Sequence, residues 1–127
     1  MEKIQSRAET LEERLIDFSI LVVQIAEALS GTDFGKKMRD QLCRSAPSSA
    51  LNYGESRAAE SRKDFMHKMK VCLKELRETF VALKSVKKYL DYKKEHAQGL
   101  DAALKENNEL ISIFVKSIQT AGKRGGD

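Results

Sequence analysis

The chain has 127 residues, 41% of them hydrophobic and 33% charged, and its 23 Lys and Arg residues against 19 Asp and Glu residues give a formal net charge of +4. This length suits one domain with a modest core. One Pro, seven Gly and no Trp provide too few turn-forming residues for a β-sandwich or β-barrel, so the composition indicates an all-α protein. No apolar run approaches the roughly 20 residues of a membrane span and no signal-peptide core is recognisable, so we expect a cytoplasmic protein without membrane contact.

The first predicted helix spans residues 4–30. Thr10 followed by Glu13 fits a capping box near its start. Apolar residues recur at alternating steps of four and three, a spacing that places them on one face: Leu11, Leu15, Phe18, Val22, Ile25 and Leu29. Three further apolar residues widen this stripe, so we expect neighbouring helices on two of its sides: Ile16, Ile20 and Val23.

The second predicted helix spans residues 33–60, because Gly31 ends the first helix and Thr32 or the residue after it caps the next one. Its middle, residues 45–50, carries small side chains that allow two backbones to approach closely. Pro47 lacks a backbone N–H and clashes with the carbonyl four residues earlier, so the helix either kinks there or stops and restarts. We expect a continuous, kinked helix, because the helical spacing continues beyond the proline at Leu51, Tyr53 and Ala58.

The third predicted helix spans residues 62–94 and carries the clearest pattern. Ser61 suits its N-terminus as a cap, and Asp64 suits it as a charge that complements the helix dipole. Eight residues repeat at alternating steps of four and three, with one polar member at Thr79: Phe65, Met69, Cys72, Leu76, Thr79, Leu83, Val86 and Leu90. This helix therefore presents one long face to the core.

The fourth predicted helix spans residues 98–121, near a break at Gly99. Its stripe repeats in the same way: Leu100, Leu104, Asn107, Ile111, Phe114 and Ile118. A polar residue in the middle of a core stripe often fixes register or oligomeric state, whereas a core face through Leu110 would leave Asn107 at its edge. We expect residues 1–121 to form a single domain and residues 122–127 to form a disordered tail.

Charge is divided unevenly along the chain. Residues 1–30 carry a net charge of −3, whereas residues 61–96 carry +6. On the third helix the face opposite the apolar stripe contains no acidic residue, and we call this face the basic ridge: His67, Lys70, Lys74, Arg77, Val81, Lys84 and Lys88. Its five Lys and Arg residues are candidate contacts to nucleic-acid phosphates, and further cations of the second helix extend them: Arg44, Lys36 and Lys37. The alternative is an ordinary solvated helix face.

Sequence motifs for catalysis or cofactor binding are absent. No phosphate-binding loop is present, and the helical positions of His67 and Cys72 point apart, so they cannot act as a base and a nucleophile. The Glu-x-x-His pairs of di-iron bundles are also missing. We therefore expect a protein that is not an enzyme, without metal or cofactor, in which Cys43 and Cys72 are small buried residues.

Four polar residues surround the small-residue stretch of the second helix, in a region expected to be buried: Arg44, Asn52, Tyr53 and Glu55. Because buried polar groups must be paired, we interpret them as an internal hydrogen-bond network that fixes the packing of this helix. A ligand pocket at the same place is the alternative.

Three sequence elements between about residues 15 and 90 carry a family resemblance. They are QLCRSA at 41–46, NYGES at 52–56, and DF at 64–65 leading into KELRET at 74–79. Their order and spacing resemble the bacterial four-helix-bundle family founded on proteins encoded in intervening sequences of 23S rRNA genes. This chain departs from the family pattern at Ser56, where the family has Ala, a change between two small residues.

The resemblance implies an antiparallel up-down four-helix bundle that assembles into a ring-shaped homopentamer without catalytic residues. The family includes the accessory protein of diversity-generating retroelements, which implies RNA and a reverse transcriptase-type protein as possible partners. One hypothesis is that the basic ridge binds RNA or an RNA–protein complex. The alternative is a protein-interaction scaffold, in which the acidic first helix of one subunit pairs with the basic third helix of another.

Overall fold

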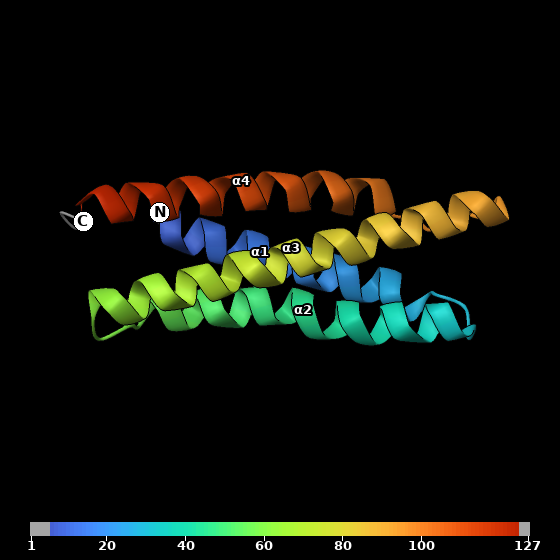
Figure 1. The fold of residues 1–127 in the computed structure, drawn as a ribbon, viewed down its shortest axis with the longest axis horizontal. Coiled ribbons are helices and arrows are strands. Elements are labelled where there is room, and N and C mark those ends of the chain that lie inside the picture. The colour runs from blue at the N-terminus through green and yellow to red at the C-terminus, as the bar shows by residue number, and fades with distance from the viewer. Residues whose placement is uncertain (1–5, 125–127) are drawn as a thin grey trace, which may run out of the picture.

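A computed structural model describes residues 6–124 as four helices, with no strand in that range. They are α1 (Arg7–Glu27), α2 (Asp33–Arg57), α3 (Arg62–Lys93) and α4 (Leu100–Arg124), shown in Figure 1. The expected all-α, four-helix fold is confirmed. Residues 4–5 of the expected first helix and residues 125–127 of the expected tail lie outside the described residues. Residues 122–124 belong to α4, three residues beyond its expected end.

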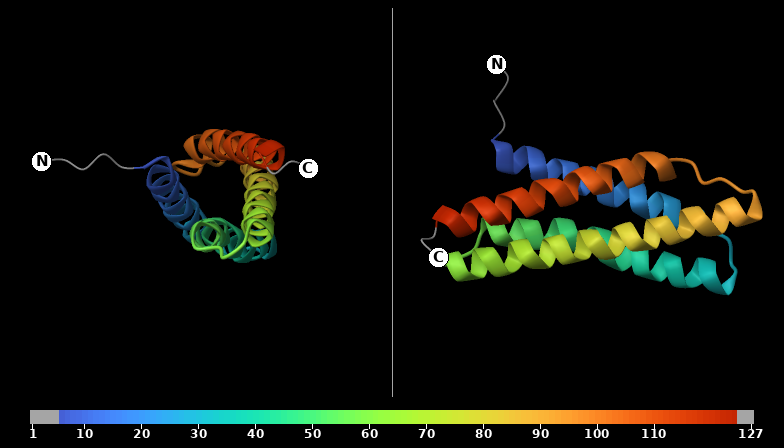
Figure 2. Two further views of the ribbon diagram at one scale, coloured as in Figure 1. Left: turned by 90° about the vertical axis from the view of Figure 1, so that its left-hand side faces the viewer. Right: turned by 45° about the horizontal axis from the view of Figure 1, so that its top comes forward.

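The four helices lie alongside one another and enclose a shared core, as the view along the bundle in Figure 2 shows. The most extensive contact joins α2 to α3, followed by α1 to α2 and α3 to α4. The contact between α1 and α4 is the smallest of the packed pairs. The bundle is therefore tightest around α2 and α3 and loosest between its first and last helices.

The start of α1 differs from the sequence expectation. Ser6 caps the helix, and its hydroxyl accepts a hydrogen bond from the Glu9 backbone N–H. Thr10 lies inside the first turn, where its hydroxyl donates to the Ser6 carbonyl. The predicted box at Thr10 and Glu13 is therefore wrong, because Ser6 and Glu9 satisfy the same spacing one turn earlier.

The starts of α2 and α3 agree with their sequence signals. Thr32 caps α2 by accepting a hydrogen bond from the Gly35 N–H. Ser61 caps α3 by accepting from the Asp64 N–H, so the two candidates for this helix start act together, one as cap and one as first-turn acid. The break before α4 is also where the sequence placed it, because Gly99 adopts a positive φ of 85° that favours glycine.

The predicted stripe of α3 is confirmed as a core face. Seven of its eight members are buried, including Thr79, and Phe65 at its start is half-buried. The central stripe of α1 is buried as well: Leu15, Phe18, Val22 and Ile25. Two of the three residues expected to widen the α1 stripe are exposed, Ile16 by 38% and Ile20 by 53%, whereas Val23 is half-buried. Helix α1 does have two packed neighbours, α2 and α4, but they do not cover the side on which Ile16 and Ile20 lie.

The core face of α4 lies slightly to one side of the predicted stripe. Its buried members are Leu100, Ala103, Asn107, Leu110 and Phe114. Asn107 is fully buried. In the amide orientation that pairs both its NH₂ group and its oxygen, the NH₂ group donates to the Leu76 carbonyl and the oxygen accepts from the Phe80 N–H, each at 3.0 Å. The sequence offered Asn107 and Leu110 as alternatives, and the structure buries both.

Helix α2 passes through Pro47 without interruption, which confirms the continuous alternative. Beside the proline, Ser45 and Ser49 are fully buried. The Cys72 thiol of α3 donates to the Ser49 carbonyl at 3.0 Å, so a side chain of α3 reaches the backbone of α2. The small residues therefore allow the close approach that the sequence indicated, whereas Leu51 on the opposite side is 70% exposed.

Candidate nucleic-acid interface

The basic ridge runs along the outer face of α3, the longest helix of the described chain. Every member is exposed: His67, Lys70, Lys74, Arg77, Val81, Lys84 and Lys88. At 1.5 Å per residue, the backbone positions of Lys70 and Lys88 are separated by about 27 Å along the helix axis. The structure therefore keeps all five cations of the ridge on one continuous, solvated surface.

The cations of the basic ridge differ from other cations nearby in their pairing. Lys68 pairs with Glu55 at 3.0 Å, and Lys87 lies 3.4 Å from Asp91 and 3.6 Å from Asp101. In contrast, none of the five ridge cations forms an ion pair with any residue in the described part of the chain. Each ridge cation is therefore exposed and makes no direct ion-pair contact within residues 6–124.

An apolar position divides the ridge into two groups of cations. Val81 is 58% exposed and lies between Arg77 and Lys84. Together with Met38 of α2, Val81 and Arg77 line a shallow groove between α2 and α3. The Lys84 ammonium lies 4.7 Å from the centroid of the Phe80 ring, a cation–π contact that holds one ridge cation in place.

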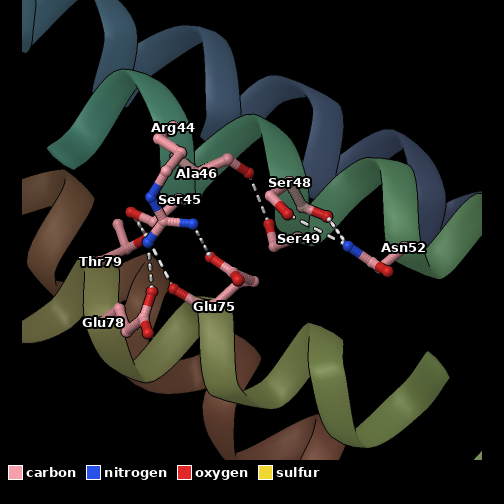
Figure 3. Close-up of polar contacts among 9 residues, drawn as sticks. All are labelled: Arg44, Ser45, Ala46, Ser48, Ser49, Asn52, Glu75, Glu78 and Thr79. Carbon is pink, nitrogen blue, oxygen red and sulfur yellow. Dashed lines mark hydrogen bonds and ion pairs between the residues drawn. The ribbon is translucent and has the colours of Figure 1, made fainter. Parts of the chain in front are cut away.

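Arg44 does not extend the ridge as a free cation. Its guanidinium bridges from α2 to two carboxylates of α3, at 3.2 Å from Glu75 and 2.5 Å from Glu78 (Figure 3). Two acids therefore offset its charge, although its side chain is half exposed. Lys36 and Lys37, at the start of α2, are exposed and remain available to extend the basic surface.

Glu75 is a buried acid, with 7% of its surface exposed. Burial and the neighbouring Glu78 carboxylate raise the pKa of Glu75, and the Arg44 guanidinium opposes this shift. Removal of Arg44 would leave a carboxylate in a poorly solvated place, which is energetically costly. The contact between Arg44 and Glu75 is therefore part of the α2–α3 packing rather than of a binding surface.

Two buried hydroxyl groups, those of Ser45 and Thr79, lie beside the ion pair between Arg44 and Glu75. Thr79 donates to the Glu75 carbonyl at 2.8 Å, and its oxygen lies 2.8 Å from the Ser45 hydroxyl. Since the single Thr79 proton goes to the carbonyl, Ser45 is the donor between the two hydroxyls. Figure 3 shows these groups facing one another across the seam. Both hydroxyls have hydrogen-bond partners, so Thr79 can occupy a core position.

The four residues expected to share one polar network have separate partners. Asn52 donates to the Ser48 carbonyl within α2, and Glu55 pairs with Lys68 of α3. Tyr53 packs its ring edge-on against Phe114 of α4, with ring centroids 5.5 Å apart. No hydrogen bond joins Arg44, Asn52, Tyr53 and Glu55 to one another within the described residues. The polar network that the structure does contain is Arg44, Ser45, Glu75, Glu78 and Thr79.

The pairing of Arg44 with Glu75 and the position of Ser45 beside it were not predicted from the sequence. One signal was available, because Glu75 directly precedes a core leucine and lies one turn before Thr79 on α3. A carboxylate next to a core stripe needs a cationic partner, and Arg44 is flanked by residues destined for burial. Which cation reaches it depends on the register between α2 and α3, and a single sequence does not reveal that register.

Residues 6–124 contain neither a metal-binding cluster nor a membrane-spanning helix. No group of three or more His, Cys, Asp or Glu side chains between residues 6 and 124 is arranged to hold a metal ion. None of the helices in this range combines the length and the apolar character needed to cross a bilayer.

Comparison with known proteins supports the fold. The sequence matches no protein-family model, and no curated protein is similar to it. Its structure is similar to the crystal structure of a protein with unknown function from the S23 ribosomal protein family of Bacteroides thetaiotaomicron, with a TM-score of 0.73 and 21% sequence identity. The similarity covers 90% of this chain and 99% of the other. At this level of identity, it shows that the two proteins share a four-helix fold.

Proposed function

We propose that this protein is a non-enzymatic, oligomeric helical-bundle protein whose basic ridge binds RNA or an RNA–protein complex. One observation carries the proposal: five cations lie on one exposed helix face, and none of them is paired with an acid of the described chain. Such a row contacts phosphates without reading base sequence. The ridge cations are Lys70, Lys74, Arg77, Lys84 and Lys88.

The assembly that we propose follows from the family resemblance. An antiparallel up-down bundle in a ring-shaped homopentamer would present several copies of the basic ridge to one RNA, which raises the effective affinity through multivalency. The fold shared with a member of the S23 ribosomal protein family supports this resemblance. In this setting a cytoplasmic accessory role beside a reverse transcriptase-type protein and its RNA is the corresponding partner hypothesis.

The test is an RNA-binding titration with a structured RNA at increasing salt, together with a charge-reversal variant. The variant carries Lys74→Glu, Arg77→Glu and Lys84→Glu on the ridge. We expect wild-type affinity to fall steeply with salt, because phosphate contacts release counterions, and we expect the variant to lose binding. A matched control reverses three exposed lysines outside the ridge and has the same net charge: Lys63, Lys105 and Lys123.

Circular dichroism and sedimentation accompany the titration, so that loss of folding or of assembly is recognised. Loss of binding in the ridge variant alone, with unchanged helicity and mass, supports the proposal. RNA affinity that survives the ridge reversal would refute the assignment of this surface. Equal losses in the ridge variant and the control would show that binding follows net charge rather than the ridge.

A second candidate function is a protein-interaction scaffold, and exposed apolar residues favour it. Ile16 and Ile20 of α1 are exposed on the same face as the acids Glu13 and Asp17. Val81 is an exposed apolar residue among cations on α3. The two surfaces combine apolar centres with flanks of opposite charge, as a head-to-tail contact between copies requires.

The scaffold makes a different prediction for the same ridge variant. Reversal of the ridge charges would then lower the sedimentation mass, and Ile20→Lys on the acidic face would do the same. A mass that neither variant nor high salt changes would argue against this function.

A further inference from the structure

A cleft opens between α1 and α4 at the end of the bundle where α1 begins and α4 ends. Its volume is about 980 Å³, and all four helices contribute to its walls. A second hollow of about 580 Å³ continues it along α4 and shares Phe65 and Ile113 with it. The cleft lies between the two helices whose contact is the smallest of the packed pairs.

The floor of the cleft is apolar. Leu11 of α1, Phe65 of α3 and Ile113 of α4 line it and are only half-buried. Tyr53 and Met69 form its deeper part and belong to the hydrophobic core. Apolar side chains from three helices, α1, α3 and α4, are therefore left partly uncovered at one place.

Ion pairs keep the inner part of the cleft in shape. Arg14 of α1 crosses to α4, where its guanidinium contacts Glu106 and, at 3.1 Å, Glu109. Arg57 of α2 holds Glu12 of α1 at 3.2 Å. These contacts join α1 to both of its neighbouring helices at the inner end of the cleft.

The rim of the cleft is positively charged. Arg7, Arg62 and Lys116 are exposed, and they line the two hollows. None of the three is paired with an acid of residues 6–124, and no Asp or Glu lines either hollow. An apolar floor within a cationic rim is complementary to a ligand that is apolar on one side and acidic at its edges.

We propose that this cleft binds an amphipathic helix with acidic flanks, supplied by a partner protein. The cleft lies between two helices and remains open along one side, whereas a small-molecule site encloses most of its ligand. A fifth helix laid beside α1 and α4 would cover Leu11, Phe65 and Ile113 with apolar residues one turn apart. Its acidic flanks would meet the cationic rim. No cation of the basic ridge lines the cleft, so this inference is independent of the proposed RNA binding.

The probe is a synthetic amphipathic peptide with leucines at helical i, i+3, i+4 and i+7 spacing and glutamates on its flanks. A matched peptide carries lysines in place of the glutamates. Fluorescence anisotropy with the full chain is expected to show saturable binding of the acidic peptide and none of the basic one. Ile113→Glu in the floor and Arg62→Glu in the rim should each weaken binding about tenfold or more, because each places an acid against the bound helix.

Leu51→Glu is the matched control, because it introduces the same charge at an exposed apolar residue outside the cleft. It should leave peptide binding unchanged. Circular dichroism shows whether each variant folds, and Arg62→Glu changes an exposed side chain, so it keeps the test valid if Ile113→Glu unfolds the bundle.

Several outcomes would overturn the proposal. Equal affinity for the two peptides, or full binding by both cleft variants, would show that the cleft does not select such a helix. Loss of peptide binding in the ridge charge-reversal variant would place the site on α3. Peptide binding that appears only after deletion of residues 1–5 would identify this N-terminal segment, rather than a partner protein, as the occupant of the cleft. A sedimentation mass lowered by Ile113→Glu would identify a second copy.

Discussion

The Arg44 guanidinium of α2 lies 3.2 Å from the carboxylate of Glu75, the one acidic side chain that is buried among residues 6–124. The carboxylate of Glu78 forms a second ion pair with the same guanidinium. This relationship joins the two most extensively packed helices of the bundle, and it explains why an exposed arginine is placed beside a core of small residues.

Replacement of Arg44 by methionine should destabilise the bundle. Arg44→Met keeps the apolar stem but leaves the buried Glu75 carboxylate without a cation, at an expected cost of about 1–2 kcal/mol in the free energy of unfolding. Urea denaturation measures the cost. Lys74→Met, at an exposed and unpaired position of the ridge, should change the free energy by less than about 0.5 kcal/mol. Equal stabilities of the two variants would contradict the structural role of Arg44.

The pKa of Glu75 predicts the sign of a pH effect on stability. Because burial raises this pKa, the folded protein binds the Glu75 proton more tightly than the unfolded chain does. This contribution to stability is complete below the ordinary pKa of a carboxyl group and is lost as the pH rises through the raised value. Glu75→Gln removes the titration, so its stability relative to wild type should increase as the pH rises from about 4 to 7.

Urea denaturation across this pH range measures the difference. Glu60→Gln, which removes the carboxyl group of an exposed acid, is the matched control. A wild-type minus Glu75→Gln difference that does not vary with pH would contradict the raised pKa.

Asn107→Asp should be strongly destabilising at neutral pH. A carboxylate cannot donate to the Leu76 carbonyl, and at this position it would be a fully buried charge without a cation. We expect a loss of about 3–5 kcal/mol at pH 7 and a smaller loss at pH 4, where the protonated acid can donate again. Thermal or urea denaturation at both pH values measures this. Asn108→Asp, one residue away and exposed, should be close to neutral.

The two cysteines should differ in their reaction with a thiol reagent. Cys72 is fully buried and bonded to the Ser49 carbonyl, and burial raises the pKa of its thiol, so little thiolate is available. Cys43 is half-buried, and burial raises its pKa as well. We expect one thiol per chain to react with a disulfide reagent under native conditions and the second only on unfolding. Cys43→Ser should abolish the native reaction, whereas rapid labelling of that variant would contradict the buried position of Cys72.

The parts of the fold that the sequence predicted are those that local periodicity determines. The stripe of α3 was predictable because apolar residues keep one helical spacing from Met69 to Leu90. The start of α1 was not, because two overlapping cap signals, at Ser6 and Thr10, fit the same rule. In α4 the apolar and small residues cover a wide arc, and the partner α3 decides that Ala103 and Leu110 face the core.

The candidate site also combines features that local periodicity predicts with features that depend on tertiary packing. Exposure of the ridge followed from its position opposite the core stripe, which periodicity alone establishes. The pairing of Arg44 with Glu75 did not follow, because the two residues lie 31 positions apart and their meeting depends on the register of α2 against α3. The exposure of Ile16 and Ile20 depends on the angle that α2 and α4 cover around α1, which is also a tertiary property.

The unequal contacts around the bundle affect how it unfolds. Separation of α2 from α3 would break the most extensive contact and the buried hydrogen bond between Ser45 and Thr79, whereas detachment of α4 breaks its contact with α3 and the small contact with α1, less than detachment of any other helix. A partly unfolded state in which α4 has left the other three helices is therefore the expected lowest-energy opening of the molecule. Amide protons of α2 and α3 should exchange with solvent most slowly, and those of α4 should exchange at a lower free energy than global unfolding.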